Sequence, residues 1–461
     1  MKYDLLELVA GKAIYGGKTL SNHGTKKVIL ERALPGEKVM AYVKQRKKGY
    51  LECVAKEFIE RSPHRKPHEC AYYPYCGGCK MLDVEYSFQL KLKEDAVTDC
   101  ITRIGKIEDY EKLDIVPSPK DRRYRNKMEF TFSNLKYYFN DEIRDENDVF
   151  FLGFHAPKIF NKVIDINHCY LQSEKMNEIF NSLKSICKES GYQAYDVVTH
   201  EGFFRYLVMR ETFDGKVMIN IVTKRFEEQL ITDLAKKFVE DNPSIVSIVN
   251  TINKGMGNTA YGDESYLIYG EEKVYDYIGK YKFEISVNSF FQVNPFQTEN
   301  LYNKAFEIGE IQKGDKVIDL YCGVGTISLF AAEKASVVTG FELVENAVLN
   351  ARKNADINGV TNCDFFSGDL MSIVQERSIF KEKNYDVIIT DPPRDGMHPK
   401  VINSIVKSGI KKIIYISCNP STFARDAEML EAGGYKLFKA GAVDMFPNTY
   451  HVEVVSVFEK I

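Results

Sequence analysis

The sequence predicts an α/β protein with a Rossmann-like C-terminal domain, an N-terminal β-barrel and a central, mainly-β domain of α+β type. Two observations predict this fold class. From about residue 295, short apolar strands alternate with helical segments, which is typical of a parallel sheet covered on both faces. Residues 1–60 instead alternate apolar and polar positions between Gly and Pro-Gly turns, as the short strands of a small barrel do.

Length and composition set the broad class. With 461 residues, 44% of them hydrophobic and 28% charged, the chain is long enough for two or three globular domains. No apolar run reaches the roughly 18 residues of a membrane span, and the first residues lack the pattern of a signal peptide. We therefore expect a cytoplasmic protein with no membrane partner and no obligate protein partner.

Charge is uneven along the chain. The net charge is −3, but residues 1–80 hold 16 lysines and arginines against 8 acidic residues. A basic N-terminal region on an acidic body is compatible with a polyanionic partner. A solvated surface without a partner explains the same pattern equally well.

The first two thirds of the chain combine helices and strands. Pro63 and Pro67 interrupt regular structure after the barrel. Apolar side chains at helical spacing predict helices over residues 84–105, 173–190 and 226–240. The first of these is a candidate to pack on the C-terminal domain. The predicted domains are the barrel (1–60), the central domain (61–285) and the Rossmann-like domain (286–461).

The C-terminal strands follow the β/α alternation. They are predicted at KVIDLY, VVTGFE, CDFFSGD, YDVIITD, KIIYIS, YKLFKAGAVDMF and VEVVSVFEK. Helical segments separate the first five strands, and none separates the last two. The sequence therefore predicts a parallel sheet closed by an antiparallel hairpin.

Carboxylates end three successive strands of this domain. Glu342, Asp369 and Asp391 follow the second, third and fourth strands, where open α/β sheets bind ligands. The Gly-rich turn DLYCGVGTIS precedes them, but Ser328 stands where a dinucleotide fingerprint has its third glycine. Carboxylates only accept hydrogen bonds, so they favour a cationic ligand rich in donors over one with two phosphates. The crevice therefore favours S-adenosylmethionine over a nicotinamide dinucleotide.

A cysteine follows the fifth strand, in IIYISCNPST. Asn419 and Pro420 end that strand, and Ser421 and Thr422 are expected to cap the next helix, whose start would favour a thiolate at Cys418. A buried structural cysteine is the alternative. The Asp-Pro-Pro of YDVIITDPPRDG suggests methylation of nitrogen, which needs no cysteine.

Methylation of carbon does need one. C5 of a pyrimidine becomes nucleophilic when a thiolate adds at C6, and a base must then remove the C5 proton. Glu453, at the start of the last strand, is the better candidate for that base, and His451 is the rival. The residues alone thus predict a carbon methyltransferase with Cys418 as the nucleophile.

Three further cysteines form a cluster in CAYYPYCGGC. Reduced cysteines at positions 70, 76 and 79 need a fourth ligand to complete a metal site. Cys169 is the best candidate, at the end of a predicted strand, and Cys53 and Cys100 are its rivals. The spacing does not separate zinc from an iron–sulfur cluster, and free thiols are the alternative.

The motifs DLYCGVGTIS, DPPRDG, SCNPST and HVEVVSVFE, with VNSFFQVNPFQTENLY upstream, resemble the RNA (uracil-5-)-methyltransferases over essentially the whole chain. The resemblance implies Cys418 as nucleophile and Glu453 as base. It implies contacts to S-adenosylmethionine or the target base at Gln292, Tyr321, Glu342 and Asp391, and cofactor contacts at Thr326 and Asp369. The cysteine spacing is similar to that of the ribosomal-RNA branch, which implies a 4Fe–4S cluster held by Cys70, Cys76, Cys79 and Cys169, with zinc as the alternative.

Residues 1–60 resemble a TRAM domain, a small RNA-binding barrel. Candidate RNA contacts are Lys44, Arg46 and Lys47 in KQRKKGY, and Arg125 and Lys127 on a strand predicted at DRRYRNKMEF. A solvated turn is the alternative for the first group.

The resulting hypothesis is a cytoplasmic enzyme that makes 5-methyluridine in 23S rRNA, with tRNA as the alternative substrate. A nitrogen methyltransferase and a non-catalytic RNA-binding protein with a redox-sensing cluster are the rivals from other classes.

Overall fold

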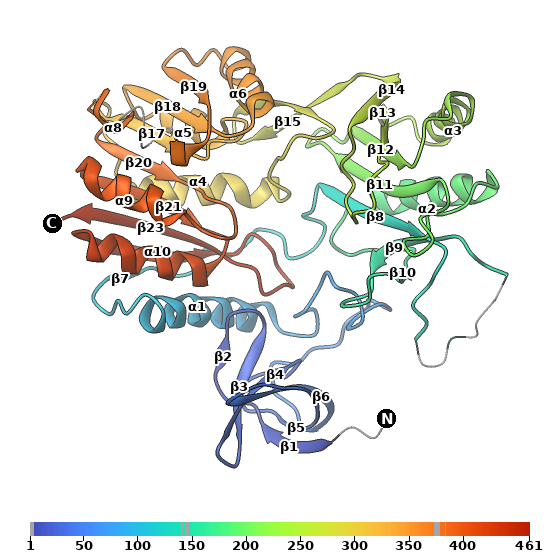
Figure 1. Ribbon diagram of the computed structural model, residues 1–461, viewed down its shortest axis with the longest axis horizontal. Helices are drawn as coiled ribbons and strands as arrows, with labels where there is room; N and C mark the ends of the chain where they lie inside the picture. Colours follow the sequence, from blue (N-terminus) through green and yellow to red (C-terminus); the bar gives the residue numbers. More distant parts are fainter. Residues whose placement is uncertain (1–3, 140–141, 143–146, 373–378, 383) are drawn as a thin grey trace. The chain divides into compact units, whose positions relative to one another are not determined.

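The computed structural model describes residues 4–139, 142, 147–372, 379–382 and 384–461 (Figure 1). The chain forms two compact units, each assembled from segments that are distant in the sequence. The first unit comprises Met1–His68, Lys80–Asp121 and Gln297–Ile461, and the second comprises Glu69–Cys79 and Arg122–Phe296. The predicted limits at residues 60 and 285 differ from these boundaries, and the three-domain division stays a prediction.

The N-terminal part of the first unit is a six-stranded sheet in the order β1-β5-β6-β4-β3-β2. Its strands are β1 (Leu5–Val9), β2 (Ala13–Ile14), β3 (Lys18–His23), β4 (Lys26–Glu31), β5 (Lys38–Arg46) and β6 (Tyr50–Glu60). Alternate residues such as Leu8, Val28 and Val39 are buried in one apolar core. β1 also contacts β3, so the sheet curls toward a barrel, as the alternating pattern predicts.

An eight-stranded sheet in the order β19-β18-β17-β20-β21-β23-β22-β7 forms the rest of the first unit. Its strands are β7 (Glu111–Lys112), β17 (Lys316–Leu320), β18 (Val337–Glu342), β19 (Cys363–Ser367), β20 (Val387–Thr390), β21 (Lys412–Ser417), β22 (Tyr435–Val443) and β23 (Glu453–Lys460). The five strands from β17 to β21 are mutually parallel, and β23 runs antiparallel to β21 and β22. The parallel sheet and its closing hairpin are therefore confirmed.

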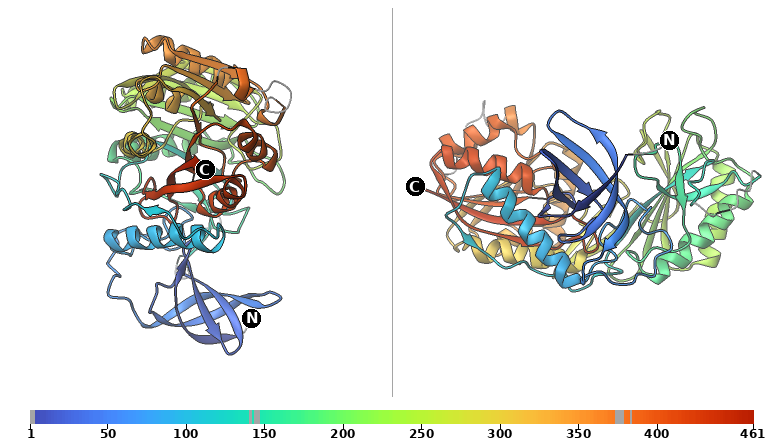
Figure 2. Two further views of the ribbon diagram at one scale, coloured as in Figure 1. Left: turned by 90° about the vertical axis from the view of Figure 1, so that its left-hand side faces the viewer. Right: turned by 90° about the horizontal axis from the view of Figure 1, so that it is seen from below.

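Helices cover both faces of this sheet (Figures 1 and 2). They are α1 (Tyr86–Arg103), α4 (Pro295–Gly309), α5 (Thr326–Ala332), α6 (Glu345–Ile357), α8 (Ile379–Glu382), α9 (Pro399–Ser408) and α10 (Pro420–Ala432). α1 lies beside α10, and its Val97 and Ile101 belong to the same core as β17 and β21. The early helix thus packs on the Rossmann-like domain, because its apolar face completes that domain's core.

The second unit contains a seven-stranded sheet in the order β10-β9-β8-β11-β12-β13-β14. The strands are β8 (Lys127–Ser133), β9 (Phe151–His155), β10 (Val163–Asp165), β11 (Phe204–Glu211), β12 (Val217–Thr223), β13 (Ile245–Ile252) and β14 (Glu264–Gly270), with a separate hairpin of β15 (Lys273–Ile278) and β16 (Tyr281–Ser286). Helices α2 (Glu174–Glu189) and α3 (Glu228–Asp241) share the core of this sheet. Among the described strands of this sheet, β12 and β13 are the one parallel pair, and α3 provides the crossover that such a pair needs.

Within the described ranges, no helix combines the length and the apolar character that a membrane crossing requires.

Candidate active site

The carboxyl ends of the parallel strands bring the candidate residues of the first unit to one edge of the sheet. Leu320 of β17 pairs with Phe341 of β18 and with Thr390 of β20. The residues that follow these three positions are Tyr321, Glu342 and Asp391. Since the strands run in the same direction, the structure brings these predicted residues together at the edge where α/β sheets bind ligands.

The turn after β17 is held in a special backbone conformation. Tyr321 has a φ of 67°, which is rare for an aromatic residue, and Gly323 and Gly325 have φ values of 55° and 83°. A Cβ atom at Gly325 would lie 3.1 Å from the ring of Phe365. The backbone N–H of Gly323 donates to Glu342 Oε2 (3.1 Å). Gly325 therefore leaves space beside Phe365, and the N–H of Gly323 orients the carboxylate of Glu342.

Glu342 is fixed from two sides. Its Oε1 accepts from the N–H of Val344 (3.0 Å), while its Oε2 accepts from Gly323. Each carboxylate oxygen can accept a second hydrogen bond. Glu342 thus retains capacity for two hydroxyl donors, which fits the ribose of a nucleoside cofactor.

Burial keeps other carboxyl groups at this edge protonated to unusually high pH. Burial raises the pKa of Asp319 to about 7, with smaller contributions from Asp391 and Glu342. Burial also raises the pKa of Asp391. A site with this many carboxyl groups favours a cation, because a positive ligand stabilises their ionised forms.

Cys418 faces Glu453 across neighbouring strands. Ser417 of β21 pairs with Val454 of β23, and the two strands are antiparallel, so the next residue of β21 lies opposite the preceding residue of β23. Glu453 is only 7% exposed, and its pKa is raised by burial first and by Asp391 second, while Arg394 lowers it. The predicted nucleophile and base are therefore neighbours.

The predicted thiolate is not what the structure shows. Burial raises the pKa of Cys418 to about 11, the charges of Glu453 and Asp391 raise it further, and Arg394 lowers it. The surroundings thus disfavour the predicted thiolate, because burial first and the carboxyls of Glu453 and Asp391 second outweigh the exposed guanidinium of Arg394. The thiol therefore has to transfer its proton before or during its reaction.

The predicted helix cap is also corrected. α10 begins at Pro420, and its N-cap is Asn419, whose side chain accepts from the N–H of Ser421 (3.1 Å). Asn419 Nδ2 and Thr422 Oγ1 both donate to the carbonyl of Arg394 (2.9 and 3.0 Å). These hydrogen bonds connect the turn after Cys418 to the Asp-Pro-Pro-Arg loop, and so they fix the ends of β20 and β21 relative to each other.

The other predicted cofactor residues are less tightly grouped. Asp369 follows β19 and accepts from the N–H of Met371 (3.2 Å), while Thr326 opens α5 and exchanges a 3.0 Å hydrogen bond with Tyr302. Burial raises the pKa of Tyr321 to about 12. Gln292 belongs to the second unit, where its carbonyl accepts from Asn126 (3.3 Å), and its role stays a prediction.

All four cysteines predicted to hold a metal centre belong to the second unit. Cys169 lies in the loop after β10 rather than at a strand end, and Asn177 of α2 bonds both its N–H and its carbonyl (2.8 and 3.2 Å). Burial raises the pKa of Cys169 to about 12, and the thiols of Cys76 and Cys70 raise it further. Among the described residues, however, no three His, Cys, Asp or Glu side chains are arranged to hold a metal ion. The metal centre stays a prediction.

The predicted RNA-binding cations differ in their surroundings. Lys44 is paired with Glu31 (2.8 Å) and Arg46 with Asp4 (2.5 Å), whereas Lys47 is exposed. In the second unit, Arg125 precedes β8 instead of lying on it, and its Nε donates to the carbonyl of Lys127 (3.0 Å). Burial lowers the pKa of Lys127, and Arg210 lowers it further. Their contact with RNA stays a prediction.

The sequence analysis missed Tyr15, which belongs to the barrel but contacts Cys418, the predicted nucleophile. Its hydroxyl donates to the carbonyl of Cys418 (3.4 Å), and its ring packs against the Rossmann-like core. Only the short glycine turn AIYGG marked this position, and a turn does not reveal what its neighbours contact.

Comparison with known proteins identifies the family. Residues 85–461 match the family described as tRNA (Uracil-5-)-methyltransferase, which is more than half of the chain. The protein belongs to the RNA (uracil-5-)-methyltransferase family. It is therefore an RNA-modifying enzyme, and the resemblance seen in its motifs is confirmed.

Relatives of this methyltransferase extend over the full chain. An RNA methyltransferase of Chlorobaculum tepidum, itself uncharacterised, is 37% identical over 100% of this chain and 97% of its own length. Another from Bacteroides thetaiotaomicron is 36% identical over 96% of this chain and 99% of its own. The crystal structure of Pyrococcus abyssi tRNA (uracil-54, C5)-methyltransferase in complex with S-adenosyl-L-homocysteine superimposes with a TM-score of 0.74, at 29% identity, over 98% of this chain and 99% of that one.

Proposed function

We propose that this methyltransferase transfers a methyl group from S-adenosylmethionine to C5 of a uridine in RNA. The observation that carries the proposal is the register that sets Cys418 opposite Glu453 at the carboxylate-rich edge of the sheet. A nucleophilic thiol and a buried carboxyl at one site are what carbon methylation requires. Methylation of nitrogen needs neither.

The proposed reaction uses the chain's own groups in order. Cys418 first loses its proton to solvent. Its Sγ bonds to C6 of uracil, and the electron pair released at C5 takes the methyl group of the sulfonium, leaving S-adenosylhomocysteine. Glu453 then accepts the C5 proton. The C6–S bond breaks with its electrons returning to sulfur, which restores the thiolate and the aromatic ring.

The residues at the sheet edge fit this cofactor. Bound S-adenosylmethionine supplies the electrophilic methyl group. Glu342 would accept from the ribose hydroxyls, and the ionised forms of Asp391 and Asp369 would balance its cationic groups. Tyr321, Thr326 and Gln292 complete the proposed set of contacts to cofactor or target base.

The proposed substrate is 23S rRNA, because a barrel and a cysteine cluster accompany the catalytic domain. tRNA is the second candidate, and two observations support it. The matching family is described by tRNA, and the Pyrococcus abyssi enzyme acts on uracil-54 of tRNA. RNA binding would involve the barrel, as a TRAM domain, through Lys44, Arg46 and Lys47, and the second unit through Arg125 and Lys127.

The test offers labelled S-adenosylmethionine with unmodified 23S rRNA and with a tRNA pool in separate reactions. We expect 5-methyluridine as the only methylated nucleoside, identified by mass spectrometry, and we expect Cys418→Ala to abolish it. 5-methyluridine in tRNA alone would overturn the choice of 23S rRNA and keep the reaction. A methylated adenine, or activity without Cys418, would overturn the reaction itself.

A further inference from the structure

A cavity of about 420 Å³ opens beside the reactive cysteine, between the barrel and the Rossmann-like domain of the first unit. Its polar and aromatic lining consists of Tyr15, Lys18, Arg394, Asn419, Tyr450 and His451. Neither Cys418 nor Glu453 lines it. The cavity therefore adjoins the pair Cys418 and Glu453, and Asn419, which directly follows Cys418, forms part of its wall.

The barrel closes this cavity with a glycine hairpin. Gly16 and Gly17 join β2 to β3 with φ values of 95° and 69°, and a Cβ atom at Gly17 would lie 3.3 Å from the side chain of Tyr450. The rings of Tyr15 and Tyr450 meet edge to face with centroids 6.1 Å apart. A side chain at Gly17 would crowd Tyr450, and the positive φ there also favours glycine, so this residue suits the close approach of the hairpin to the loop before β23.

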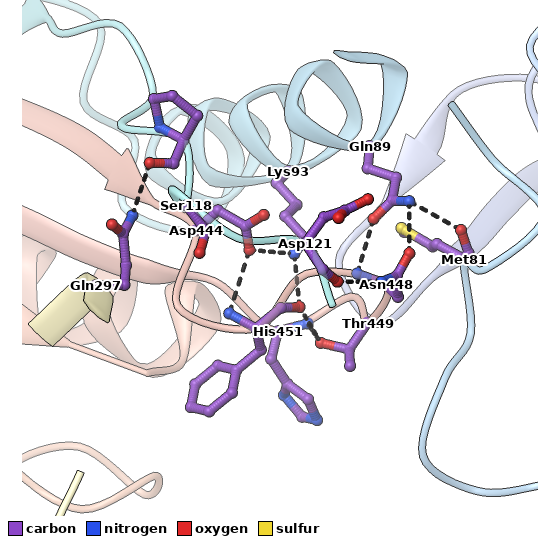
Figure 3. A network of polar contacts seen from close by, with 12 residues as sticks. Met81, Gln89, Lys93, Ser118, Asp121, Gln297, Asp444, Asn448, Thr449 and His451 are labelled. Atoms are coloured by element: carbon purple, nitrogen blue, oxygen red, sulfur yellow. Dashed lines mark hydrogen bonds and ion pairs between the residues drawn. The ribbon is translucent and has the colours of Figure 1, made fainter. Parts of the chain in front are cut away.

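The loop on the opposite wall is fixed from behind by a polar network (Figure 3). Thr449 Oγ1 accepts from the N–H of His451 (3.1 Å), and Asn448 is held through its backbone N–H by Gln89 of α1 (2.8 Å). The rings of Tyr450 and His451 stand 4.3 Å apart. The aromatic wall is therefore preorganised, which reduces the cost of ordering it around a ligand.

Two cations stand at the same cavity. Lys18 is 3.7 Å from Glu31, a carboxylate that Lys44 also engages at 2.8 Å. The exposed side chain of Arg394 makes no ion pair or hydrogen bond with any described residue. Aromatic rings beside cations are the combination that binds single-stranded RNA, because bases stack on rings and phosphates pair with cations.

We propose that this cavity binds the nucleotide adjacent to the target uridine in the RNA chain. Its base stacks on the ring of Tyr15, beside the perpendicular ring of Tyr450, and its phosphate lies near Lys18 and Arg394. The inference rests on the proposed function, because the adjacent nucleotide is defined by the uridine that Cys418 attacks. It assigns the barrel a role in positioning the RNA chain beside the target.

The test uses the RNA that the native enzyme methylates, prepared with an abasic residue at the position before or after the target. In the native enzyme, one of the two abasic RNAs should lose about 5- to 150-fold in kcat/KM, the range that stacking of one base on an aromatic ring provides. Tyr15→Ala should lose a similar factor with the intact RNA. It should lose little more with the abasic RNA, because both changes remove one contact.

Controls separate this contact from misfolding. Phe438→Ala removes an exposed ring of β22 that does not line the cavity, and it should behave as the native enzyme. Tyr15→Phe, which keeps the ring, should restore most of the activity. Binding of S-adenosylhomocysteine should be unchanged in Tyr15→Ala, and its melting temperature should stay well above the assay temperature although the ring packs against the core. The proposal would be overturned if the loss of kcat/KM from Tyr15→Ala multiplied the loss from each abasic RNA, because the two changes would then remove independent contacts.

A phosphate contact has its own signature. Lys18→Ala should weaken RNA binding and reduce the slope of log affinity against log salt by about 0.7, the value for one phosphate on a single strand. Lys26→Ala, at the β3–β4 turn outside the cavity, is the matched control. An unchanged slope for Lys18→Ala would remove the phosphate part of the proposal. If the native enzyme methylates no uridine, the proposed function fails, and that outcome is distinct from a failure of the cavity alone.

Discussion

At the scale of the residue, the proposed reaction depends on two carboxyl groups, Glu453 and Asp391, beside the thiol of Cys418. The pKa of Glu453 is raised by burial and by Asp391, so its ordinary state at neutral pH is closer to protonated than that of a surface glutamate. The pKa of Cys418 is raised to about 11 by burial and by the same two carboxyls. A base has to be deprotonated to accept the C5 proton, and a thiol has to ionise to attack. Both requirements make the rate rise with pH.

The first residue-scale prediction concerns Glu453→Gln. The amide cannot accept the C5 proton, so methylated uracil should remain bonded to Cys418. We expect a covalent protein–RNA adduct that survives denaturing electrophoresis and carries the labelled methyl group, with turnover reduced by at least about 100-fold. The native enzyme should show kcat/KM rising between pH 6 and pH 9, on the order of tenfold per unit where one proton is lost.

Cys418→Ala is the control for this experiment, because it should give neither adduct nor product. His451→Gln tests the rival base and should turn over without accumulating an adduct. Rapid turnover by Glu453→Gln would assign the proton transfer to another group.

The sequence predicted part of this site from strand order alone. Cys418 and Asp391 follow adjacent strands, and Glu453 starts the second strand of the hairpin that closes the sheet, so their meeting follows from topology. Tyr15 was not predictable in this way. It lies 403 positions from Cys418, and no periodic pattern encodes which distant residue a turn contacts.

At the scale of the element, α1 holds the loop between β22 and β23 in place. Lys93 Nζ donates to Asp444 Oδ1 (2.6 Å) and to the carbonyl of Phe446 (3.0 Å), and both side chains of the pair are at most 1% exposed. Tyr86 Oη donates to Asp444 Oδ2 (2.9 Å). These contacts join α1 to the loop between β22 and β23. Periodicity predicted α1 from its apolar residues, and it does not show what the polar residues of the same helix contact.

We predict that Lys93→Met lowers the free energy of unfolding by about 3–5 kcal/mol, because it leaves the carboxylate of Asp444 buried without its cation. Urea unfolding followed by circular dichroism measures the change. The double variant Lys93→Met with Asp444→Asn removes both charges and should recover at least half of the loss. Lys91→Met is the matched control, since Lys91 pairs with Asp95 on the exposed face of the same helix and should change stability by less than about 1 kcal/mol. A loss by Lys93→Met as small as this control's would show that the buried pair does not anchor the loop.

At the scale of the whole molecule, the chain passes from the first unit to the second and back again. Glu69–Cys79 belongs to the second unit, while the segments before and after it belong to the first. The sequence predicted the elements on either side, because local periodicity encodes helices and strands. It did not predict that a short loop rich in cysteine would leave one unit for the other, because compact units form through contacts between distant segments. The sequence analysis placed the cysteine cluster in the central domain (61–285), but within that range only the helix over 84–105 was a candidate for the C-terminal domain, whereas the whole segment Lys80–Asp121 belongs to the first unit.

Because Glu69–Cys79 belongs to the second unit, the cysteine cluster is a candidate metal cross-link within that unit. A metal centre held by Cys70, Cys76, Cys79 and Cys169 would join the loop Glu69–Cys79 to the loop after β10, and metal ligation contributes directly to folding stability. We predict that protein purified without oxygen contains iron and acid-labile sulfide, together with the broad visible absorbance of an iron–sulfur cluster. Cys169→Ser should lose both the iron and several degrees of melting temperature, whereas Cys53→Ala, in the barrel core, should keep the iron. Zinc in place of iron would support the proposed cross-link between the two loops and change only the identity of its metal. Protein that contains no metal, and whose melting temperature is unaffected by Cys169→Ser, would show that the four thiols are free. Packing alone would then hold the loop Glu69–Cys79 to the second unit, for example beside the hydrogen bond that the backbone N–H of Asn167 donates to Tyr72 Oη (2.9 Å).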